Sequence, residues 1–272
     1  MIFILILVCI AGLYLCSISP RLMGKPDTSM FFKKYYAHRG LHHLHDDIPE
    51  NSVAAIKKAV EMGYGIEMDI QLTKDKELVV FHDDSLLRMC GVQGKVGDYT
   101  FEELQQFSLE NTEEKIPAFK DVLKIVDGKV PLIIEIKAYR QPFELAKYAN
   151  ALLSGYDGEY CVEAFHSGVL LWYRLHNKSV IRGQLSSHFR KDGEKEGISL
   201  FCVRHLLLNF IGKPDFIAYN HKYAAAVSRS ICEKLYKAPA AAWTITSQEE
   251  LNQAKKHFDI YIFERFIPNE NI

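Results

Sequence analysis

The sequence predicts an α/β protein, because short apolar runs rich in β-branched residues alternate with helical patterns along most of the chain. Several of these runs are apolar almost throughout, as expected for parallel strands that are buried on both faces. About eight such repeats in a body of roughly 240 residues fit a closed (β/α)8 barrel. The candidate strands are residues 35–37, 65–72, 78–81, 132–136, 160–165, 180–185, 216–219, 240–244 and 260–263.

A doubly wound open sheet is the alternative fold, and it would require a Gly-rich phosphate loop after the first strand. The residues at that place, HRGLHH, form no such loop. The segment 84–115 contains MCGVQGKVGDYT and fits no simple βα step, so we interpret it as a short insertion after the third strand. A helix is expected between the first two strands, because Asn51 and Ser52 are good N-caps and an apolar stripe follows them.

The N-terminal segment predicts a membrane anchor. No charged side chain occurs from Met1 to Ser19, and a helix needs roughly 20 apolar residues to span the hydrocarbon core. A signal peptide would carry a basic n-region and a cleavage site, yet no Lys or Arg precedes Arg21. We therefore expect a single-pass transmembrane helix over residues 1–19, a linker over 20–31 and a barrel domain over 32–272. Basic residues after the helix predict that the barrel domain lies on the cytoplasmic side.

The composition narrows the choice of partners. The chain of 272 residues has a formal net charge of −1, so bulk electrostatics favour no nucleic-acid partner. Its six cysteines form no C-x-x-C pair and no Cys-His spacing that is typical of zinc sites. We expect the four cysteines beyond the N-terminal segment to be small core residues rather than disulfides.

Polar side chains follow or end several of the predicted strands. In a closed barrel the C-terminal ends of the strands meet at one rim, where such enzymes carry their chemistry. The residues concerned are His38, Arg39, Glu67, Asp69, His82, Glu135, Lys137 and Trp243. A single residue of this kind is more often a salt bridge or a satisfied structural residue, but complementary groups at four successive strand ends favour a functional site.

Three of these residues are carboxylates that we expect inside the barrel. Glu67 and Asp69 are spaced i, i+2, so both point to the same face of their strand. Glu135 supplies a third carboxylate from another strand. Buried unpaired charge is costly, so such carboxylates need protons, partners or a metal. Oxygen ligands alone suit a hard cation, Mg²⁺ or Ca²⁺, better than zinc.

The other residues complete a possible phosphate site. Arg39 is suited to bidentate phosphate binding, and Lys137 adds positive charge at the same rim. His38 and His82 can each donate or accept a proton near neutral pH. Together these groups predict metal-assisted phosphoryl transfer with a general base and a general acid.

Several motifs resemble those of the glycerophosphodiester phosphodiesterase family. The resemblance covers the chain beyond the N-terminal segment and is most specific in its first half. The motifs are AHRG (37–40), PENS (49–52), GIEMDIQLTKDKELVVFHD (65–83), IPAF (116–119), IIEIK (133–137) and WTIT (243–246).

The resemblance implies a TIM-barrel hydrolase that binds Ca²⁺ or Mg²⁺ and cleaves glycerophosphodiesters to sn-glycerol 3-phosphate and an alcohol. Its implied metal ligands are Glu67, Asp69 and Glu135, and its acid/base pair is His38 with His82. Its implied substrate-binding residues are Arg39, Lys137, Glu50 and Trp243. The nucleophile is either water or the 2-hydroxyl of the substrate's own glycerol.

The chain departs from the family pattern at three places. Ala164-Phe165 replaces the usual Ser-Phe pair after the fifth strand, and the last strand lacks the usual glycines, with Glu264 near the expected acid. His42, His43 and His45 follow the first strand, and we expect them to be solvated loop residues. These departures leave the alcohol open.

Two rival functions stay open. The first is a related phosphodiesterase of the lysophospholipase D or phosphatidylinositol phospholipase C type, acting on a lysolipid or another membrane lipid. The second is a non-enzymatic binding protein on the same scaffold, although no member of the acid/base and metal set is missing.

Overall fold

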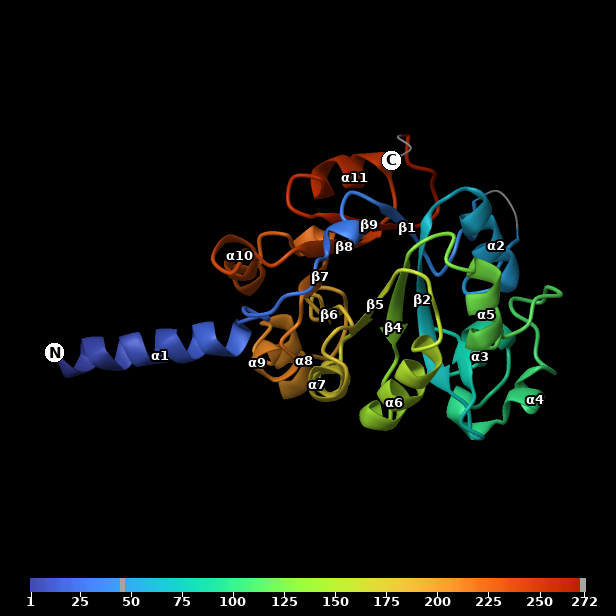
Figure 1. Ribbon diagram of the computed structural model, residues 1–272, viewed down its shortest axis with the longest axis horizontal. Helices are drawn as coiled ribbons and strands as arrows, with labels where there is room; N and C mark the ends of the chain where they lie inside the picture. The colour runs from blue at the N-terminus through green and yellow to red at the C-terminus, as the bar shows by residue number, and fades with distance from the viewer. Residues whose placement is uncertain (45–46, 270–272) are drawn as a thin grey trace.

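The strand β1 (Tyr35–His38) closes the sheet into a barrel, because it pairs in parallel with both β2 (Gly65–Leu72) and β9 (Ile260–Phe263). The computed structural model, which describes residues 1–44 and 47–269, is shown in Figure 1. The other parallel strands are β4 (Leu132–Ile136), β5 (Tyr160–Ala164), β6 (Arg182–Ser186), β7 (Phe216–Asn220) and β8 (Ala240–Ile245). Closure confirms the predicted barrel and excludes the open doubly wound sheet.

The predicted third strand is not part of the parallel barrel. β3 (Leu78–Val80) pairs antiparallel with β2, which is itself continuous with the barrel. Thr73 donates its backbone N–H to the carbonyl of Glu77 at 3.0 Å, so a tight turn joins the two strands. A parallel partner would have required a crossover of about a dozen or more residues. β3 therefore runs back alongside the last residues of β2, in the direction opposite to the barrel strands.

The insertion after β3 is confirmed and has a small core of its own. It holds α3 (Leu87–Cys90), the 3-10 turn η2 (Val96–Asp98) and α4 (Phe101–Leu104). Its core consists of Val79, Phe81, Leu86, Met89, Val96, Leu104, Leu109 and Ile116, all buried. This packing holds the segment that follows β3 in place.

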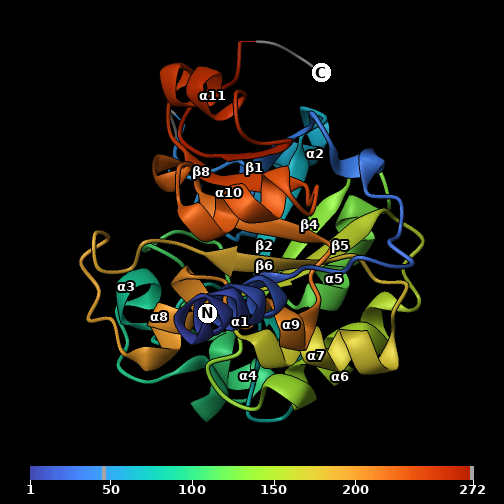
Figure 2. The ribbon, with the colours of Figure 1, turned by 90° about the vertical axis from the view of Figure 1, so that its left-hand side faces the viewer.

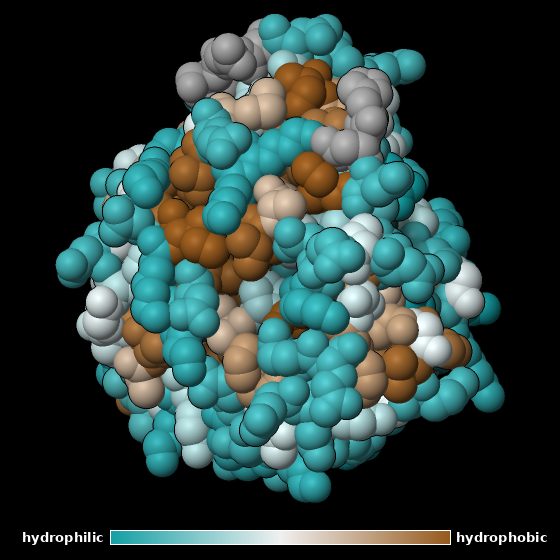
Figure 3. All heavy atoms as spheres, turned by 90° about the vertical axis from the view of Figure 1, so that its right-hand side faces the viewer, coloured by the Kyte–Doolittle hydropathy of each residue, from teal (hydrophilic) through white to brown (hydrophobic). Residues whose placement is uncertain are grey.

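Helices cover the outside of the barrel (Figures 1 and 2). α2 (Val53–Glu61) begins where predicted, because the Ser52 hydroxyl accepts the N–H of Ala55 at 3.1 Å. The remaining helices of the barrel domain are α5 (Phe119–Val126), α6 (Pro142–Leu153), α7 (Ser167–His176), α8 (Ile198–Arg204), α9 (Asn209–Gly212), α10 (Val227–Lys234) and α11 (Gln248–Ala254), with 3-10 turns η1 (Ser29–Phe31) and η3 (His221–Tyr223). Figure 3 shows the face on the side of α2 and α5, where hydrophobic side chains gather in one patch among hydrophilic ones.

Two buried layers stabilise the barrel. The larger lies between the strands and the surrounding helices, and the smaller fills the barrel interior with residues such as Tyr36, Ile133 and Phe216. A Cβ at Gly183 would lie 2.2 Å from the Phe216 ring, so that ring fills space that only glycine leaves free. Cys161 belongs to the interior layer and is a free thiol, as expected of a small core residue.

The N-terminal helix α1 (Ile2–Ile18) projects away from the barrel (Figure 1). It ends before Ser19-Pro20, where Ser19 is extended, as is typical of a residue that precedes proline. Its 17 residues rise about 25 Å, less than the ~30 Å hydrocarbon core. In residues 1–44 and 47–269, no helix combines the length and apolarity needed to cross a membrane. The predicted transmembrane anchor is therefore unsupported, and the cytoplasmic location stays a prediction.

The segment predicted as a linker packs on the barrel domain. Arg21 donates its backbone N–H to the carbonyl of Pro214 at 2.9 Å, and its guanidinium lies 3.4 Å from Asp215. Phe31 is buried in the interior layer.

Candidate active site

The predicted site residues meet at one small cavity of about 80 Å³ at the C-terminal ends of the barrel strands. His38, Arg39, Glu67, His82, Glu135, Lys137 and Trp243 line it together with Glu163, Phe165, Leu185, Thr244 and Ile262. Asp69 lies behind this surface and is fully buried. Glu50 is also buried and does not line the cavity.

The three predicted ligand carboxylates form one cluster. Ligand oxygens of Glu67, Asp69 and Glu135 all lie within 4.8 Å of one another. The strand register causes this, since Asp69 of β2 lies directly opposite Glu135 of β4 and Glu67 is two residues earlier on β2. The i, i+2 spacing therefore brought the carboxylates together as the sequence predicted.

Two cations border the cluster. The Lys137 amine lies 2.7 Å from Glu135 Oε2 and 3.1 Å from Asp69 Oδ1, and Arg39 Nε lies 3.4 Å from Asp69 Oδ2. Burial and the charge of Asp69 raise the pKa of Glu67 well above its usual value. Burial also disfavours the Asp69 carboxylate, but the charges of Lys137, His82, Arg39 and His38 together outweigh this and lower the Asp69 pKa. Three carboxylates thus share this buried site with two cations, so the cations do not neutralise all three when these are ionised.

The cluster fits a divalent cation. Among the described residues, Glu163 Oε2 is buried and has no hydrogen-bond donor, and Asp69 Oδ1 has the Lys137 amine at 3.1 Å. Such oxygens are costly unless a cation or proton satisfies them. All donor atoms in the group are carboxylate oxygens, which hard cations such as Ca²⁺ and Mg²⁺ prefer.

His38 is held by a carboxylate that the last barrel strand provides. Its Nδ1 lies 2.7 Å from Oε2 of Glu264, the residue that follows β9. Its Nε2 faces the carboxylate cluster, 3.8 Å from Glu67 Oε2. Burial tends to raise the Glu264 pKa, but the hydrogen bond and charge of His38 lower it to about 2. Burial and the Arg39 charge lower the His38 pKa, and the ionised Glu264 offsets part of this effect.

One expectation about the histidines near this strand was wrong. His42 is buried rather than solvated, with its Nε2 3.9 Å from Glu264 Oε2. Burial and the neighbouring His38 lower its pKa to about 4, so His42 is neutral at pH 7. His43 is part-exposed and lies 3.0 Å from Glu110 Oε2, whereas His45 is outside the described residues.

His82 is held by a different kind of pair. Its Nδ1 lies 2.6 Å from Oδ1 of Asp83, and Arg88 binds the same carboxylate at 2.7 and 3.0 Å. The main chain is fixed as well, because Gln71 donates to the carbonyls of residues 81, 82 and 83 and Tyr139 Oη donates to the His82 carbonyl. Asp83 is therefore shared between His82 and Arg88. Among the described residues, the arginine near Glu264 is Arg265, whose Nε lies 3.8 Å from Glu264 Oε1.

Arg39 is fixed by a buried ion-pair chain. Its Nη1 donates to Glu50 Oε1 at 2.7 Å, and Arg88 donates to the same Glu50 at 2.6 Å. Burial favours the neutral form of Glu50, but hydrogen bonds from Arg88 and the charge of Arg39 lower its pKa to about 2. The predicted substrate-binding residue Glu50 thus faces two arginines and orients Arg39 beside the cavity.

The backbone around Arg39 adopts left-handed conformations that turn it towards the cluster. Arg39 and Asn51 have φ values of 54° and 56°, and Arg39 donates its backbone N–H to Glu67 Oε2 at 3.1 Å. Asn51 Nδ2 donates to Asp69 Oδ2 at 2.8 Å, so the residue that precedes the Ser52 N-cap of α2 also supports the cluster. Gly40 has φ 77°, and a Cβ there would lie 2.9 Å from Ala55.

An aromatic wall completes the cavity. Trp243 and Phe165 pack edge to face with ring centroids 5.7 Å apart. Among the described residues, the Trp243 Nε1–H is buried and lacks an acceptor. This donor is thus available at the cavity, and the substrate-binding role of Trp243 stays a prediction.

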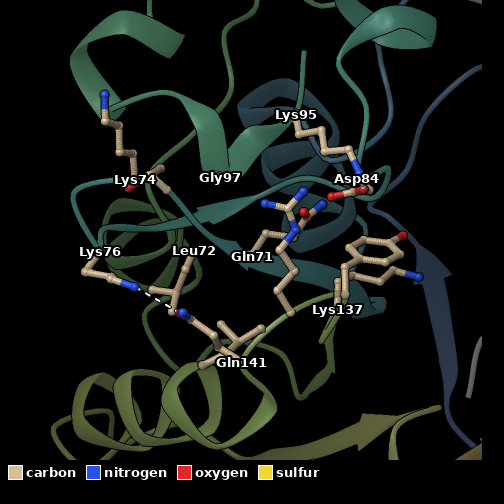
Figure 4. A pocket seen from close by; sticks show the side chains of 13 residues that line it. Gln71, Leu72, Lys74, Lys76, Asp84, Lys95, Gly97, Lys137 and Gln141 are labelled. Atoms are coloured by element: carbon tan, nitrogen blue, oxygen red, sulfur yellow. Dashed lines mark hydrogen bonds and ion pairs between the residues drawn. The ribbon is translucent and has the colours of Figure 1, made fainter.

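A larger cavity of about 200 Å³ lies beside the site and is lined by many basic residues (Figure 4). Its amines are mostly engaged with other protein groups. Lys76 binds Gln141 at 3.1 Å and Glu144 at 2.8 Å, and Lys95 contacts Asp84. Lys137 extends to the carboxylate cluster. The cavity contains none of the histidines, so the smaller one is the candidate active site.

Sequence reasoning missed four residues of this site. Glu264 was noted only as standing near an expected acid, and Glu163, Asp83 and Arg88 received no role. The one available signal was a charged residue inside an apolar strand, which applies to Glu163 in YCVEA. The partners of the other three depend on contacts across the closed barrel or within the insertion.

Comparison with known sequences confirms the resemblance stated from the motifs. The glycerophosphoryl diester phosphodiesterase family profile matches residues 38–255. Mouse glycerophosphodiester phosphodiesterase 1 is 33% identical over 260 residues, covering 81% of this chain and 74% of that protein. A glycerophosphodiester phosphodiesterase from Caldanaerobacter subterraneus is 41% identical over 110 residues, covering 38% of this chain and 44% of that protein. The match thus spans less than half the length of this bacterial relative.

Solved structures share the fold. A phosphodiesterase from Oleispira antarctica, determined in complex with the product sn-glycerol-3-phosphate, superposes with a TM-score of 0.69 at 21% identity, covering 86% of this chain and 94% of that one. A glycerophosphodiester phosphodiesterase from Thermotoga maritima gives a TM-score of 0.64 at 21% identity, covering 84% and 93%. Identities this low establish the common barrel.

Proposed function

The chain belongs to the glycerophosphoryl diester phosphodiesterase family, and we propose that it hydrolyses glycerophosphodiesters to sn-glycerol 3-phosphate and an alcohol with the help of a divalent cation. One observation carries the proposal. Two histidines, each bound to its own carboxylate, line one cavity with a three-carboxylate cluster and two cations. The complex of the Oleispira antarctica phosphodiesterase with sn-glycerol-3-phosphate supports the choice of product.

Glu67, Asp69 and Glu135 would hold the cation, for which Ca²⁺ and Mg²⁺ are the candidates. When bound, the cation supplies positive charge that favours the developing negative charge on the phosphate. Arg39 binds a phosphate oxygen with the guanidinium that Glu50 orients, and Lys137 adds positive charge from the opposite side of the cluster.

His38 and His82 carry the proton transfers. One imidazole takes a proton from the attacking hydroxyl, whose oxygen forms a new bond to phosphorus. The other gives a proton to the leaving alcohol oxygen as its bond to phosphorus breaks. Each transfer of this kind typically contributes roughly 10²–10⁴-fold to the rate. The attacking hydroxyl belongs either to water or to the glycerol 2-position, which would give a cyclic phosphate first.

A screen of substrates tests the proposal. The purified chain is incubated with glycerophosphocholine, glycerophosphoethanolamine, glycerophosphoglycerol and lysophosphatidylcholine, in EDTA or with added Ca²⁺, Mg²⁺ or Mn²⁺. We expect sn-glycerol 3-phosphate from at least one glycerophosphodiester, only with a cation, and no product from His38→Ala. Activity in EDTA equal to that with cations would refute the cation dependence.

The same screen separates the rival functions. Release of lysophosphatidate from lysophosphatidylcholine, with no turnover of the glycerophosphodiesters, would favour the lysophospholipase D alternative. Absence of any turnover with all three cations would favour the binding protein. A trapped cyclic phosphate distinguishes the two nucleophiles, since only attack by the glycerol 2-hydroxyl forms it, whereas oxygen from ¹⁸O-labelled water enters the final product by either route.

A further inference from the structure

We propose that Glu163 of β5 is a fourth carboxylate ligand of the cation site and that this site consequently prefers Ca²⁺ to Mg²⁺. The inference rests on the proposed function, because it concerns the cation that Glu67, Asp69 and Glu135 would hold. It adds a residue that neither the motifs nor the three-carboxylate cluster includes.

The strand register places Glu163 in line with two members of the cluster. Asp69 of β2 lies opposite Glu135 of β4, and Glu135 lies opposite Glu163 of β5. Residues opposite one another in parallel strands point to the same side of the sheet, so all three carboxylates face the barrel interior at one level. The next position along this row, on β6, is Gly183, which has no side chain.

The surroundings of Glu163 indicate a missing ligand. Its side chain lines the cavity with Glu67 and Glu135, yet the residue is only 1% exposed. Its Oε2 has no hydrogen-bond donor, and no salt bridge involving it occurs among the described residues. A buried structural glutamate is normally paired. Glu196, which lies away from the cavity and forms an ion pair with Arg204 Nε at 3.1 Å, is a control position.

The balance of charge agrees with a divalent cation. Glu67, Asp69, Glu135 and Glu163 are four carboxylates, whereas only Arg39 and Lys137 border them as cations. The count covers these six groups alone; Arg39 is also paired with Glu50, which Arg88 binds in turn. The site therefore has a formal excess of two negative charges, which one divalent ion neutralises.

The number of carboxylates also favours Ca²⁺. Ca²⁺ binds about 6–8 oxygen ligands in flexible geometry, whereas Mg²⁺ keeps several waters and is usually held by one or two carboxylates. A fourth carboxylate thus adds more to a Ca²⁺ site than to a Mg²⁺ site.

Direct titration tests the inference without reference to turnover. Calorimetry in metal-free buffer gives the Kd of Ca²⁺ and Mg²⁺ for the wild type, Glu163→Gln, Glu163→Asp and the control Glu196→Gln. We expect Glu163→Gln to weaken Ca²⁺ binding by roughly 10–100-fold and Mg²⁺ binding by less. Glu163→Asp keeps the charge but withdraws the oxygens, so a ligand role predicts weaker Ca²⁺ binding for this variant too. Glu196→Gln should bind like the wild type.

Luminescence lifetimes of bound Eu³⁺ in H₂O and D₂O count the waters on the ion. Loss of a direct ligand in Glu163→Gln should add about one water. The inference is overturned if Glu163→Asp binds Ca²⁺ with the same Kd as the wild type and Glu163→Gln has an unchanged number of waters on the ion. A wild type that binds neither cation would instead overturn the cation dependence in the proposed function. Circular dichroism in EDTA checks the fold of each variant.

Discussion

The pairing of His38 with Glu264 makes a quantitative prediction. Glu264→Gln keeps the size of the side chain but removes the negative charge that lies 2.7 Å from His38 Nδ1. His38 becomes an imidazolium during the cycle whether it acts as base or as acid. In Glu264→Gln this imidazolium lacks its counter-charge. We expect kcat to fall while KM changes little, because Glu264 does not line the cavity that would hold substrate.

The size of this effect follows from the electrostatics of the pair. The Glu264 pKa is lowered from 4.5 to about 2 despite burial of the carboxyl group, and His38 is the largest favourable cause. This lowering of the Glu264 pKa corresponds to about 3 kcal/mol. If the transition state contains the full imidazolium charge, kcat falls by up to roughly 10²-fold.

Steady-state kinetics on Glu264→Gln, Glu264→Asp and Asp83→Asn provide the assay. Asp83→Asn is the parallel variant, because it removes the carboxylate that lies 2.6 Å from the other histidine and leaves Arg88 without this partner. We expect kcat to fall for Asp83→Asn as well, because the remaining Arg88 charge opposes an imidazolium at His82. The pH profile of kcat/KM for Glu264→Gln should move its His38 limb to lower pH. A kcat within about three-fold of wild type for Glu264→Gln would refute the reasoning.

Three further predictions use other parts of the site. His82→Ala should abolish turnover and leave the circular dichroism spectrum unchanged; near wild-type kcat would contradict its role. Glu50 has a native pKa of about 2 against 4.5, so it stabilises the fold fully above pH 4.5 and loses this contribution as the pH falls towards 2, by on the order of 3 kcal/mol. Acid unfolding of Glu50→Gln should lack this component, and an identical profile would contradict it. Gly40→Ala should lower the unfolding free energy by about 2 kcal/mol in denaturant titrations, because φ is 77° and Ala55 lies 2.9 Å from the added Cβ; unchanged stability would exclude strain there.

The sequence was sufficient to predict the barrel and the charged half of the site. Apolar runs at regular intervals indicate parallel strands, and the i, i+2 spacing of Glu67 and Asp69 predicts a common face without further information. The rule that barrel strands present chemistry at one rim then groups Glu135 and Lys137 with them. These inferences succeed because they depend on local spacing and on one property of the fold.

Strand direction and strand neighbours were harder to predict. The run 78–81 has the composition of a barrel strand, and composition does not record whether a strand is parallel or antiparallel. The short connection after β2 held the necessary information, since so few residues permit only a hairpin. The pairing of His38 with Glu264 required closure, because β9 is the last strand of the chain and lies beside β1, the first.

The N-terminal helix shows a different limit. Hydropathy alone extended the apolar segment to Ser19, whereas the helix ends at Ile18 because of the following Ser-Pro pair. Each residue adds about 1.5 Å, so the 17-residue helix rises about 25 Å. Apolar composition thus predicted the helix, while the predicted membrane span finds no support in the described residues.

The residues that first indicated a functional site are also residues that destabilise the native fold. Glu67, Asp69 and Glu135 are buried carboxylates, and each would weaken the native state unless it is protonated, paired or bound to a cation. Apolar residues in the barrel interior, such as Ile133 and Phe216, offset this loss of stability. A sequence under selection for stability alone would have no reason to place carboxylates at this level of the barrel. A ligand that neutralises them must therefore stabilise the native state, which links the stability of the barrel directly to occupancy of its site.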